Sequence, residues 1–559
     1  MRAKILAVGL MALVPSMTQA DGMAPPILAM GLCASGAADV VASATPAKTV
    51  LMSGYGKADW KIATASPDAQ AFFDNGLQLG HAFAHKAALA AFEEASRRDP
   101  DCAMCLWGQA WSGGPTINFT IDAQDEAKMA ELTARAEKLA ADGPPLERQM
   151  IAALKLRYVH GGGKGAGDLA FARAMDDLAT AHPDDNVLAV LAADAWMIPA
   201  ALKENKDNLP RAVALLEGVL KRDPNDAPAI HFYIHATEMS GFGARAEPYA
   251  DRLESLAPSA SHLTHMPSHT FYWVGRYEDA YRSNADAARL DAANAASQGF
   301  TGPGATFKLF YHAHNVDYGV AGAMMAGDGE GALAITRELI GLVPSLKPDQ
   351  AWEQSVAGKA YAAQGRYADP DAVLALPDPG DKLPYLQAFW HYARGEALAR
   401  RGDAAGVRRE AAQVRRGAFQ LRGLGQYAGL SAKLTEVAGL VLDGRAAMLD
   451  NQPALAAKAF RKAAALEEEK TLADQTDPPA WWYPVRRSLA AALLAQGDSQ
   501  GAVNEARTAL VRRPGDPISL NILAQAERAL GQAAQADGHL AQARKAWAGD
   551  LSKVTLAQS

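Results

Sequence analysis

Histidines recur at a fixed interval in the middle of this chain. His231 and His265 are 34 residues apart, and so are His235 and His269. Within each unit the two histidines are four residues apart, a spacing that places both side chains on one face of a helix. A period of 34 residues is typical of a repeat built from two helices joined by a turn. The sequence therefore predicts an array of helix pairs in which the histidines occupy equivalent positions.

The apolar and small residues follow the same repeat. In the tetratricopeptide consensus, positions 8, 20 and 27 are small, position 24 is large and apolar, and position 32 is proline. The first unit of this chain carries these residues at Gly76, Ala88, Phe92, Ala95 and Pro100. Small residues suit the close crossing of two helices, and the proline ends the second helix. From residue 61 onward the chain resembles the tetratricopeptide repeat (TPR) superfamily, which implies an all-α, TPR-like right-handed superhelical solenoid of antiparallel helix pairs.

The register of the repeats organises the whole chain. Three units run in strict register at 193–226, 227–260 and 261–294, and Pro224 and Pro258 both fall at position 32. The predicted organisation is a signal peptide at 1–20, a flexible lead-in at 21–60, an N-terminal TPR-like solenoid with a histidine-rich groove at 61–365, a proline-rich hinge at 366–385 and a C-terminal TPR-like solenoid at 386–550.

The first twenty residues have the pattern of a secretory signal. Arg2 and Lys4 form a basic start, residues 5–14 an apolar centre, and residues 18–20 a small-residue cleavage site. The apolar run is too short for a membrane span, and no later segment holds eighteen uninterrupted apolar residues. The sequence therefore predicts an exported protein, located in the bacterial periplasm, without a transmembrane segment.

Composition and charge exclude several classes of function. Apolar residues make up 49% of the chain and aromatic residues 7%, which favours helices over sheets. The net charge of −7 is small for 559 residues, and the basic residues are scattered, so nucleic acid is not an expected partner. The chain carries no Ser-His-Asp, phosphate-loop or dinucleotide-binding motif, which leaves serine hydrolases, kinases and dehydrogenases without support.

The cysteines form one short motif. Cys102 and Cys105 form a CxxC, and Cys33 is the third cysteine of the chain. On a helix that begins near residue 102 both sulfur atoms would share a face, which suits a metal-ligand pair, a redox couple or two small apolar residues in a core. No second CxxC supplies the other half of a zinc site. The sequence favours the buried apolar pair.

Six histidines fall on positions that line the concave groove of a tetratricopeptide array. They are His231, His235, His262, His265, His269 and His314. Helices in contact lie about 8–10 Å apart, so imidazoles from neighbouring helices can reach one ion. Neutral imidazole binds Zn, Cu, Ni and Fe(II). The sequence therefore predicts a divalent transition-metal site, with Zn, Cu or Fe as the cofactor. The alternatives are a groove that binds a peptide or small ligand without a metal, and histidines that are purely structural.

Polar residues on the same predicted helices can support such a site. Glu238 and Asp317 also fall on groove positions, where they would complete the metal shell or orient its ligands. Glu238 is in addition a candidate general base. Tyr311 and Asn315 flank His314 and can donate hydrogen bonds to a ligand.

A proline interrupts the helix that carries three of the six histidines. Pro267 lies inside the first helix of the 261–294 unit, where it is expected to kink the helix or shift its start. Such a kink can turn His262 and His265 away from His269.

An aromatic and basic cluster lies near the C-terminus. Trp482 and Arg487 belong to the run WWYPVRR at residues 481–487. One interpretation is the packed start of a helix, with the proline near its first turn. The other is a wall that binds an extended or anionic ligand. The first interpretation is favoured, and Trp482 and Arg487 remain ligand-binding candidates.

Four segments resemble a group of uncharacterised exported bacterial tetratricopeptide proteins. They are DPDCAMCLWG from Asp99, HLTHMPSH from His262, the HN of His314 and Asn315, and PPAWWYPVR from Pro478. The resemblance implies the fold and no catalytic assignment.

Three hypotheses for the function follow from the sequence. The leading one is an exported repeat protein that binds a ligand or a protein or peptide partner in its groove, through the histidine-rich metal site. The second is a metal-dependent enzyme that activates water or oxygen at this site. The third is a metal-free peptide-binding scaffold for envelope assembly.

Overall fold

The computed structural model describes residues 49–159, 161–162, 165–203, 206–422, 428–475 and 477–559. The predicted signal peptide and Cys33 lie outside these residues. Within them the chain folds into α-helices, short 3-10 turns and loops. None of the described helices combines the length and the apolar character that a membrane span needs.

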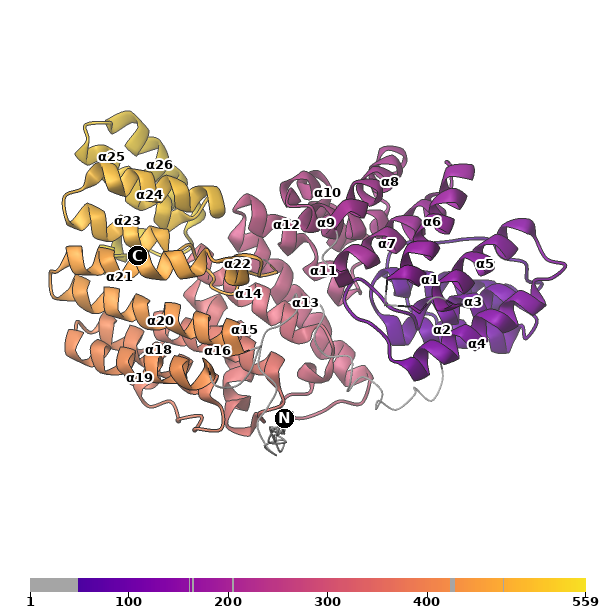
Figure 1. Ribbon diagram of the computed structural model, residues 1–559, viewed down its shortest axis with the longest axis horizontal. Coiled ribbons are helices and arrows are strands. Elements are labelled where there is room, and N and C mark those ends of the chain that lie inside the picture. The colour runs from indigo at the N-terminus through magenta and orange to yellow at the C-terminus, as the bar shows by residue number, and fades with distance from the viewer. Residues whose placement is uncertain (1–48, 160, 163–164, 204–205, 423–427, 476) are drawn as a thin grey trace, which may run out of the picture.

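The helices follow one another as antiparallel pairs along a curved row (Figure 1). The N-terminal pairs are α1 (Pro67–His81) with α2 (His85–Arg98), α3 (Ala103–Ser112) with α4 (Ala123–Leu139), α5 (Pro145–Val159) with α6 (Ala166–Ala181), and α7 (Asn186–Lys203) with α8 (Leu209–Arg222). The central pairs are α9 (Ala227–Met239) with α10 (Glu247–Leu256), α11 (Ser261–His265) and α12 (Pro267–Val274) with α13 (Tyr277–Ser297), and α14 (His312–Ala326) with α15 (Gly329–Leu342).

The C-terminal half continues in the same way. Its helices are α16 (Ala351–Tyr367), α17 (Pro370–Leu374), α18 (Pro384–Arg400), α19 (Ala404–Arg422), α20 (Ala428–Leu449), α21 (Pro453–Glu467), α22 (Lys470–Ala473), α23 (Arg486–Ala495), α24 (Ser499–Arg512), α25 (Pro517–Ala529) and α26 (Ala533–Ala546). The 3-10 turns are Lys206–Asn208, Gly243–Ala246, Thr306–Lys308, Val343–Ser345, Leu551–Lys553 and Leu556–Gln558.

The small and aromatic residues of the repeat produce the expected packing. A Cβ atom at Gly76 would lie 2.6 Å from the ring of Phe92, and one at Gly108 would lie 2.3 Å from it. The ring of Phe92 therefore fills the space that the two glycines leave between α1, α2 and α3, and it is fully buried. Such close crossings hold each helix pair against the next.

The repeat boundaries also agree with the sequence. Helix α8 ends at Arg222, two residues before Pro224, and α10 ends at Leu256, two residues before Pro258. Helices α9 and α11 then begin at the first residues of the predicted 227–260 and 261–294 units. The predicted all-α, TPR-like solenoid is confirmed.

Distant parts of the chain meet at the central helix pairs. The hydroxyl of Tyr272 on α12 donates a hydrogen bond to the carbonyl of Trp482, 2.8 Å away. The hydroxyl of Tyr277 on α13 donates to the carbonyl of Pro514, 2.9 Å away. The segment 477–485 therefore packs against α12, which carries His269, and the turn between α24 and α25 packs against α13.

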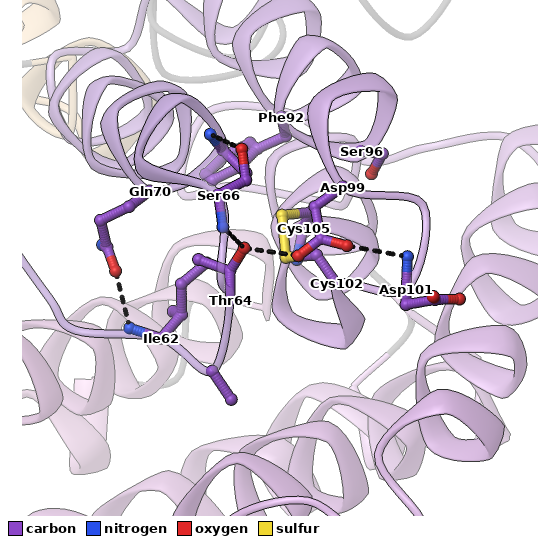
Figure 2. Close-up of a disulfide and its surroundings, with 12 residues drawn as sticks. Ile62, Thr64, Ser66, Gln70, Phe92, Ser96, Asp99, Asp101, Cys102 and Cys105 are labelled. Atoms are coloured by element: carbon purple, nitrogen blue, oxygen red, sulfur yellow. Dashed lines mark hydrogen bonds between the residues drawn. A yellow bond between two sulfur atoms is a disulfide. The ribbon is translucent and has the colours of Figure 1, made fainter.

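The CxxC motif forms a disulfide, which corrects the prediction of two free apolar side chains (Figure 2). Cys102 is the residue that precedes α3, and Cys105 lies in the first turn of this helix. In this arrangement their Cα atoms are 5.4 Å apart, a separation that a disulfide can bridge. Both side chains are buried. Sequence spacing alone did not distinguish this bond from two buried thiols.

The described part of the expected lead-in, residues 49–60, lies against the first helix pair and the central units. Asn75 on α1 accepts a hydrogen bond from the backbone of Met52 at 2.9 Å. The carbonyl of Gly54 accepts one from the backbone of Ser259 at 2.9 Å. This segment therefore links α1 to the loop between α10 and α11.

Candidate metal centre

The six predicted histidines come together inside the solenoid. Helix α9 carries His231 and His235, and α11 carries His262 and His265. Helix α12 carries His269, and α14 carries His314. Their exposed fractions are 0–4%. The sequence placed these side chains on an open groove, and the structure corrects this by placing them in the interior.

Two segments from outside these helices cover the histidines. Phe83, in the turn between α1 and α2, lies with its ring centroid 4.5 Å from that of His231 and 4.9 Å from that of His262. Its φ is 57°, a left-handed conformation that a large side chain rarely adopts. On the other side, Asp477 Oδ1 lies 3.4 Å from His269 Nδ1 and 3.8 Å from His314 Nε2. The groove is therefore closed by the N-terminal turn and by the segment that follows α22.

His231, His235 and His262 form the first group of potential ligands. One nitrogen from each of them lies within 4.8 Å of the other two. His231 Nδ1 lies 2.7 Å from the carbonyl oxygen of His81, so this nitrogen carries the proton and Nε2 carries the lone pair. His231 Nε2 lies 3.1 Å from His262 Nε2. Among the described residues, His235 Nε2 and His262 Nδ1 have no hydrogen-bond partner although both are buried.

His265, His269 and His314 form the second group, with the same 4.8 Å limit between their ligand atoms. His265 Nδ1 lies 2.6 Å from Asn284 Oδ1. The amide nitrogen of Asn284 donates to the carbonyl of Ala280 at 2.7 Å, which fixes the oxygen as the atom that faces His265. His265 Nδ1 is therefore a donor, and His265 Nε2 carries a lone pair.

A carboxylate fixes the tautomer of His269, as Asn284 does for His265. His269 Nδ1 lies 2.6 Å from Glu238 Oε2, so it is a donor and the lone pair of the neutral ring is on Nε2. The Nε2 atoms of His265 and His269 are 2.9 Å apart. Two lone pairs at this distance repel each other, so a proton or a metal ion must lie between them.

The carboxylate of Glu238 is itself held by two other side chains. Its Oε1 atom accepts hydrogen bonds from Trp273 Nε1 at 3.3 Å and from the hydroxyl of Tyr318 at 3.2 Å. Histidines that bind metals commonly donate their other ring nitrogen to such a carboxylate, which orients the ring and increases its basicity. Glu238, predicted as a shell member or general base, takes this orienting position.

The two groups of three histidines are direct neighbours. Within a group the ring centroids are 4.6–6.0 Å apart. Between the groups, the His235 and His269 rings are 5.6 Å apart and the His262 and His265 rings are 5.7 Å apart. Helix α11 ends at His265 and α12 begins at Pro267. The expectation that Pro267 turns His265 away from His269 is wrong, because their Nε2 atoms are 2.9 Å apart. His262 belongs to the first group.

Burial determines the protonation of most of these rings. It lowers the pKa of His231 to about 3 and lowers the pKa values of His235, His262, His265 and His314 well below 6.5. His269 differs. Burial lowers its pKa too, but the charges of Glu238 and Asp477 outweigh this effect and raise the pKa above 6.5. At neutral pH the first group is therefore neutral, and His269 is the ring of the second group that takes up a proton most readily.

The remaining predicted residues lie around this centre. Asp317 forms an ion pair with Lys359, with 2.8 Å between Oδ1 and Nζ. The hydroxyl of Tyr311 accepts a hydrogen bond from Asn118 at 2.9 Å. The amide of Asn315 donates to Asp291 at 2.9 Å and to the hydroxyl of Ser261 at 3.2 Å.

Trp482 and Arg487 are both buried. Trp482, together with Asp317 and Lys359, lines a narrow crevice. Arg487 forms a buried ion pair with Asp516 at 3.0 Å, and its guanidinium lies 4.0 Å from the ring centroid of Tyr483. This environment favours the structural interpretation of Arg487.

Several residues at the centre were missed in the sequence, among them Tyr318, Phe83 and Asp477. Tyr318 is four residues after His314, so its place on the same helix face was readable from the helical period. Phe83 and Asp477 carry no such signal, because they reach the histidines only through contacts between distant segments.

No protein-family model and no curated protein sequence matches this chain. Among solved structures, the chain is similar to the human IFIT1 dimer with PPP-AAAA, at 12% identity and a TM-score of 0.30, over 86% of this chain and 91% of that one. It is also similar to the APC/C hetero-tetramer Cut9-Hcn1, at 12% identity and a TM-score of 0.27, over 89% and 77% of the two chains. The Naa15/Naa10 structure bound to HypK-THB gives 12% identity and a TM-score of 0.23, over 88% and 90%. Similarity at this level supports no conclusion about ligands.

Proposed function

We propose that this protein binds two transition-metal ions, one in each group of three histidines, inside a TPR-like scaffold. The observation that carries the proposal is the contact between His265 Nε2 and His269 Nε2 at 2.9 Å. Both rings use Nδ1 as a donor, to Asn284 and Glu238, so both Nε2 atoms present lone pairs toward the same point. Two nitrogens bound to one ion at about 2.0–2.1 Å with tetrahedral angles stand about 3.3 Å apart, close to the observed distance.

The donor set favours particular ions. All six proposed ligands are imidazoles, and most are neutral at physiological pH because burial lowers their pKa values. Neutral imidazole suits Zn, Cu, Ni and Fe(II) rather than Mg or Ca, which prefer oxygen. Glu238 and Asp477 lie at Nδ1 of His269 and form with this ring a separate group of potential ligands.

We also infer that the protein is exported. The signal pattern at residues 1–20 supports this, and so does the Cys102–Cys105 disulfide, because such bonds persist mainly in oxidising compartments. The resemblance to exported bacterial proteins with an HLTHMPSH segment points to the periplasm.

A metal-dependent enzyme is the second candidate function. It is favoured by a pocket that borders Glu238 and His269, next to the second histidine group. In such an enzyme the ion would polarise a substrate or activate water or oxygen. Glu238 accepts hydrogen bonds from three side chains, which favours an orienting role over that of a general base.

Metal stoichiometry tests the proposal directly. Protein purified without an affinity tag and stripped with a chelator is expected to bind two Co(II) or Zn ions per chain, with Co(II) giving the visible absorption of nitrogen-coordinated ions. One ion per chain would contradict the two-ion arrangement. No uptake of Co, Zn, Cu or Fe would overturn the metal proposal in favour of the metal-free scaffold.

The two sites are expected to differ in their response to pH. The pKa of His269 is raised, so below that pKa a proton competes with the ion in the second group, and affinity falls by up to about tenfold per pH unit. The pKa of His231 is lowered to about 3, so the first group stays neutral through mildly acidic pH. Zinc titrations at pH 8 and pH 5 should show selective weakening of one site. Equal weakening of both sites would contradict this assignment.

A further inference from the structure

Two carboxylates lie beside the second histidine group. Glu238 Oε2 is 2.6 Å from His269 Nδ1. Asp477 Oδ1 is 3.4 Å from the same nitrogen and 3.8 Å from His314 Nε2. Their negative charges offset the positive charge of an ion that three imidazoles hold. The second group therefore reduces the cost of burying a divalent ion.

The first histidine group has no such compensation. Among the described residues, no carboxylate forms a hydrogen bond or an ion pair with His231, His235 or His262. His231 Nδ1 instead donates to a backbone carbonyl, that of His81, at 2.7 Å. The cost of burying an ion rises with the square of its charge, so a monovalent ion is much less costly in this group than a divalent one.

Aromatic rings cover the first group. The ring centroid of Phe83 lies 4.5–5.8 Å from the centroids of all three imidazoles. The ring of Tyr311 lies 4.5 Å from that of His262, and its hydroxyl accepts a hydrogen bond from Asn118 at 2.9 Å. Aromatic faces attract a cation but do not replace an oxygen ligand. Since protein-bound zinc almost always has four ligands, this cover disfavours zinc.

We propose that the first group is selective for Cu(I) and that the second group is selective for a divalent ion such as zinc. Cu(I) has a single charge and is stable with three nitrogen ligands, which is the set that the first group offers. The carboxylates beside the second group favour the ion with the higher charge. This assignment rests on the proposed function, because it requires that both groups bind metal.

Competition between the two ions tests the assignment. Chelator-stripped protein is loaded with two zinc ions per chain, and one equivalent of Cu(I) is added without oxygen. We expect one copper and one zinc ion per chain after gel filtration, and X-ray absorption should show three light neighbours around copper rather than four. Against a competing Cu(I) chelator, a second equivalent should bind at least about tenfold more weakly. Two equivalents that bind with equal affinity would overturn the proposal.

The variant His231→Ala, His262→Ala locates the tighter Cu(I) site. It removes two of the three ligands of the first group, so one equivalent of Cu(I) should no longer displace zinc from the protein with the higher affinity. If Cu(I) still displaces zinc with that affinity, the copper lies in the second group and the assignment is wrong.

Substitutions of Phe83 test the physical cause of the selectivity. Its φ is 57°, a conformation that Asp and Asn tolerate. Phe83→Asp adds a carboxylate at the first group and should reduce its preference for Cu(I) over zinc at least about tenfold. Phe83→Asn, which removes the ring without adding a charge, should reduce this preference less.

The matched control is Phe419→Asn. Phe419 is exposed and lies on α19, outside both histidine groups, so this variant should keep the preference of the unaltered protein. A Phe83→Asp protein with an unchanged circular dichroism spectrum and an unchanged preference for Cu(I) would overturn the proposal.

The metal content separates this proposal from the proposed function. A protein that takes up neither zinc nor Cu(I) would refute the two metal sites and their selectivity together. A protein that binds two ions per chain but does not discriminate between zinc and Cu(I) would refute the selectivity and leave the two sites intact.

Discussion

The double variant His265→Ala, His269→Ala is expected to bind one metal ion per chain instead of two. These residues supply two of the three nitrogens of the second group, and a single remaining imidazole does not hold an ion in competition with water. The first group keeps His231, His235 and His262, whose hydrogen bonds do not involve the substituted rings. Plasma mass spectrometry measures the number of ions per chain. It is applied to protein from the periplasm and to chelator-treated protein that has been titrated with zinc.

Two further variants make this result interpretable. His231→Ala, His262→Ala should remove the other ion and keep the one bound by the second group. The matched control is His391→Ala, His539→Ala, because each of these histidines donates to a glutamate, Glu410 at 2.6 Å and Glu527 at 2.7 Å, without belonging to either group. This control should keep both ions. If the double variant of either histidine group loses both ions while remaining folded, the six histidines form one shared site. The two-site assignment would then be wrong.

The fold was predictable because its determinants are local. The spacing of Gly76, Phe92 and Gly108 reflects contacts between adjacent helices, and Pro224 and Pro258 mark helix ends within their own units. In a solenoid each repeat packs mainly on its neighbours, so a pattern of 34 residues carries most of the information. The closure of the solenoid depends on contacts such as Tyr277 with Pro514, which no repeat pattern encodes.

The candidate site was predictable as far as the repeat pattern determines it. The repeat places six histidines on equivalent faces of neighbouring helices, and the structure brings all six together. Their division into two groups was not predictable, because it depends on how α11 and α12 meet at Pro267. Their burial was not predictable either, because Phe83 and Asp477 approach from segments far away in the sequence. The CxxC motif shows a related limit, since its spacing favoured a buried apolar pair and the structure has a disulfide.

Asp516→Ala is expected to destabilise the C-terminal half by about 3–5 kcal/mol, because it leaves the buried cation of Arg487 without its partner. The two side chains have exposed fractions of 0% and are 3.0 Å apart. Asp516 also precedes α25 and accepts a hydrogen bond from the backbone of Ser519 at 3.2 Å. It follows Pro514, whose carbonyl accepts the hydrogen bond from Tyr277, so its loss should also loosen the contact between the C-terminal units and α13.

Asp498→Ala is the matched control for this prediction. Asp498 caps α24 in the same way, by accepting a hydrogen bond from the backbone of Gly501 at 2.8 Å, but it is exposed and has no buried cation beside it. Loss of this cap should cost about 1 kcal/mol. Asp516→Asn, which keeps a cap acceptor and removes the charge, separates the two contributions. Thermal unfolding ranks the three variants by their loss of stability. Hydrogen exchange shows whether that loss lies in α23–α25. Equal effects of Asp516→Ala and Asp498→Ala would mean that the cap, rather than the ion pair, holds this end of the solenoid against the histidine helices.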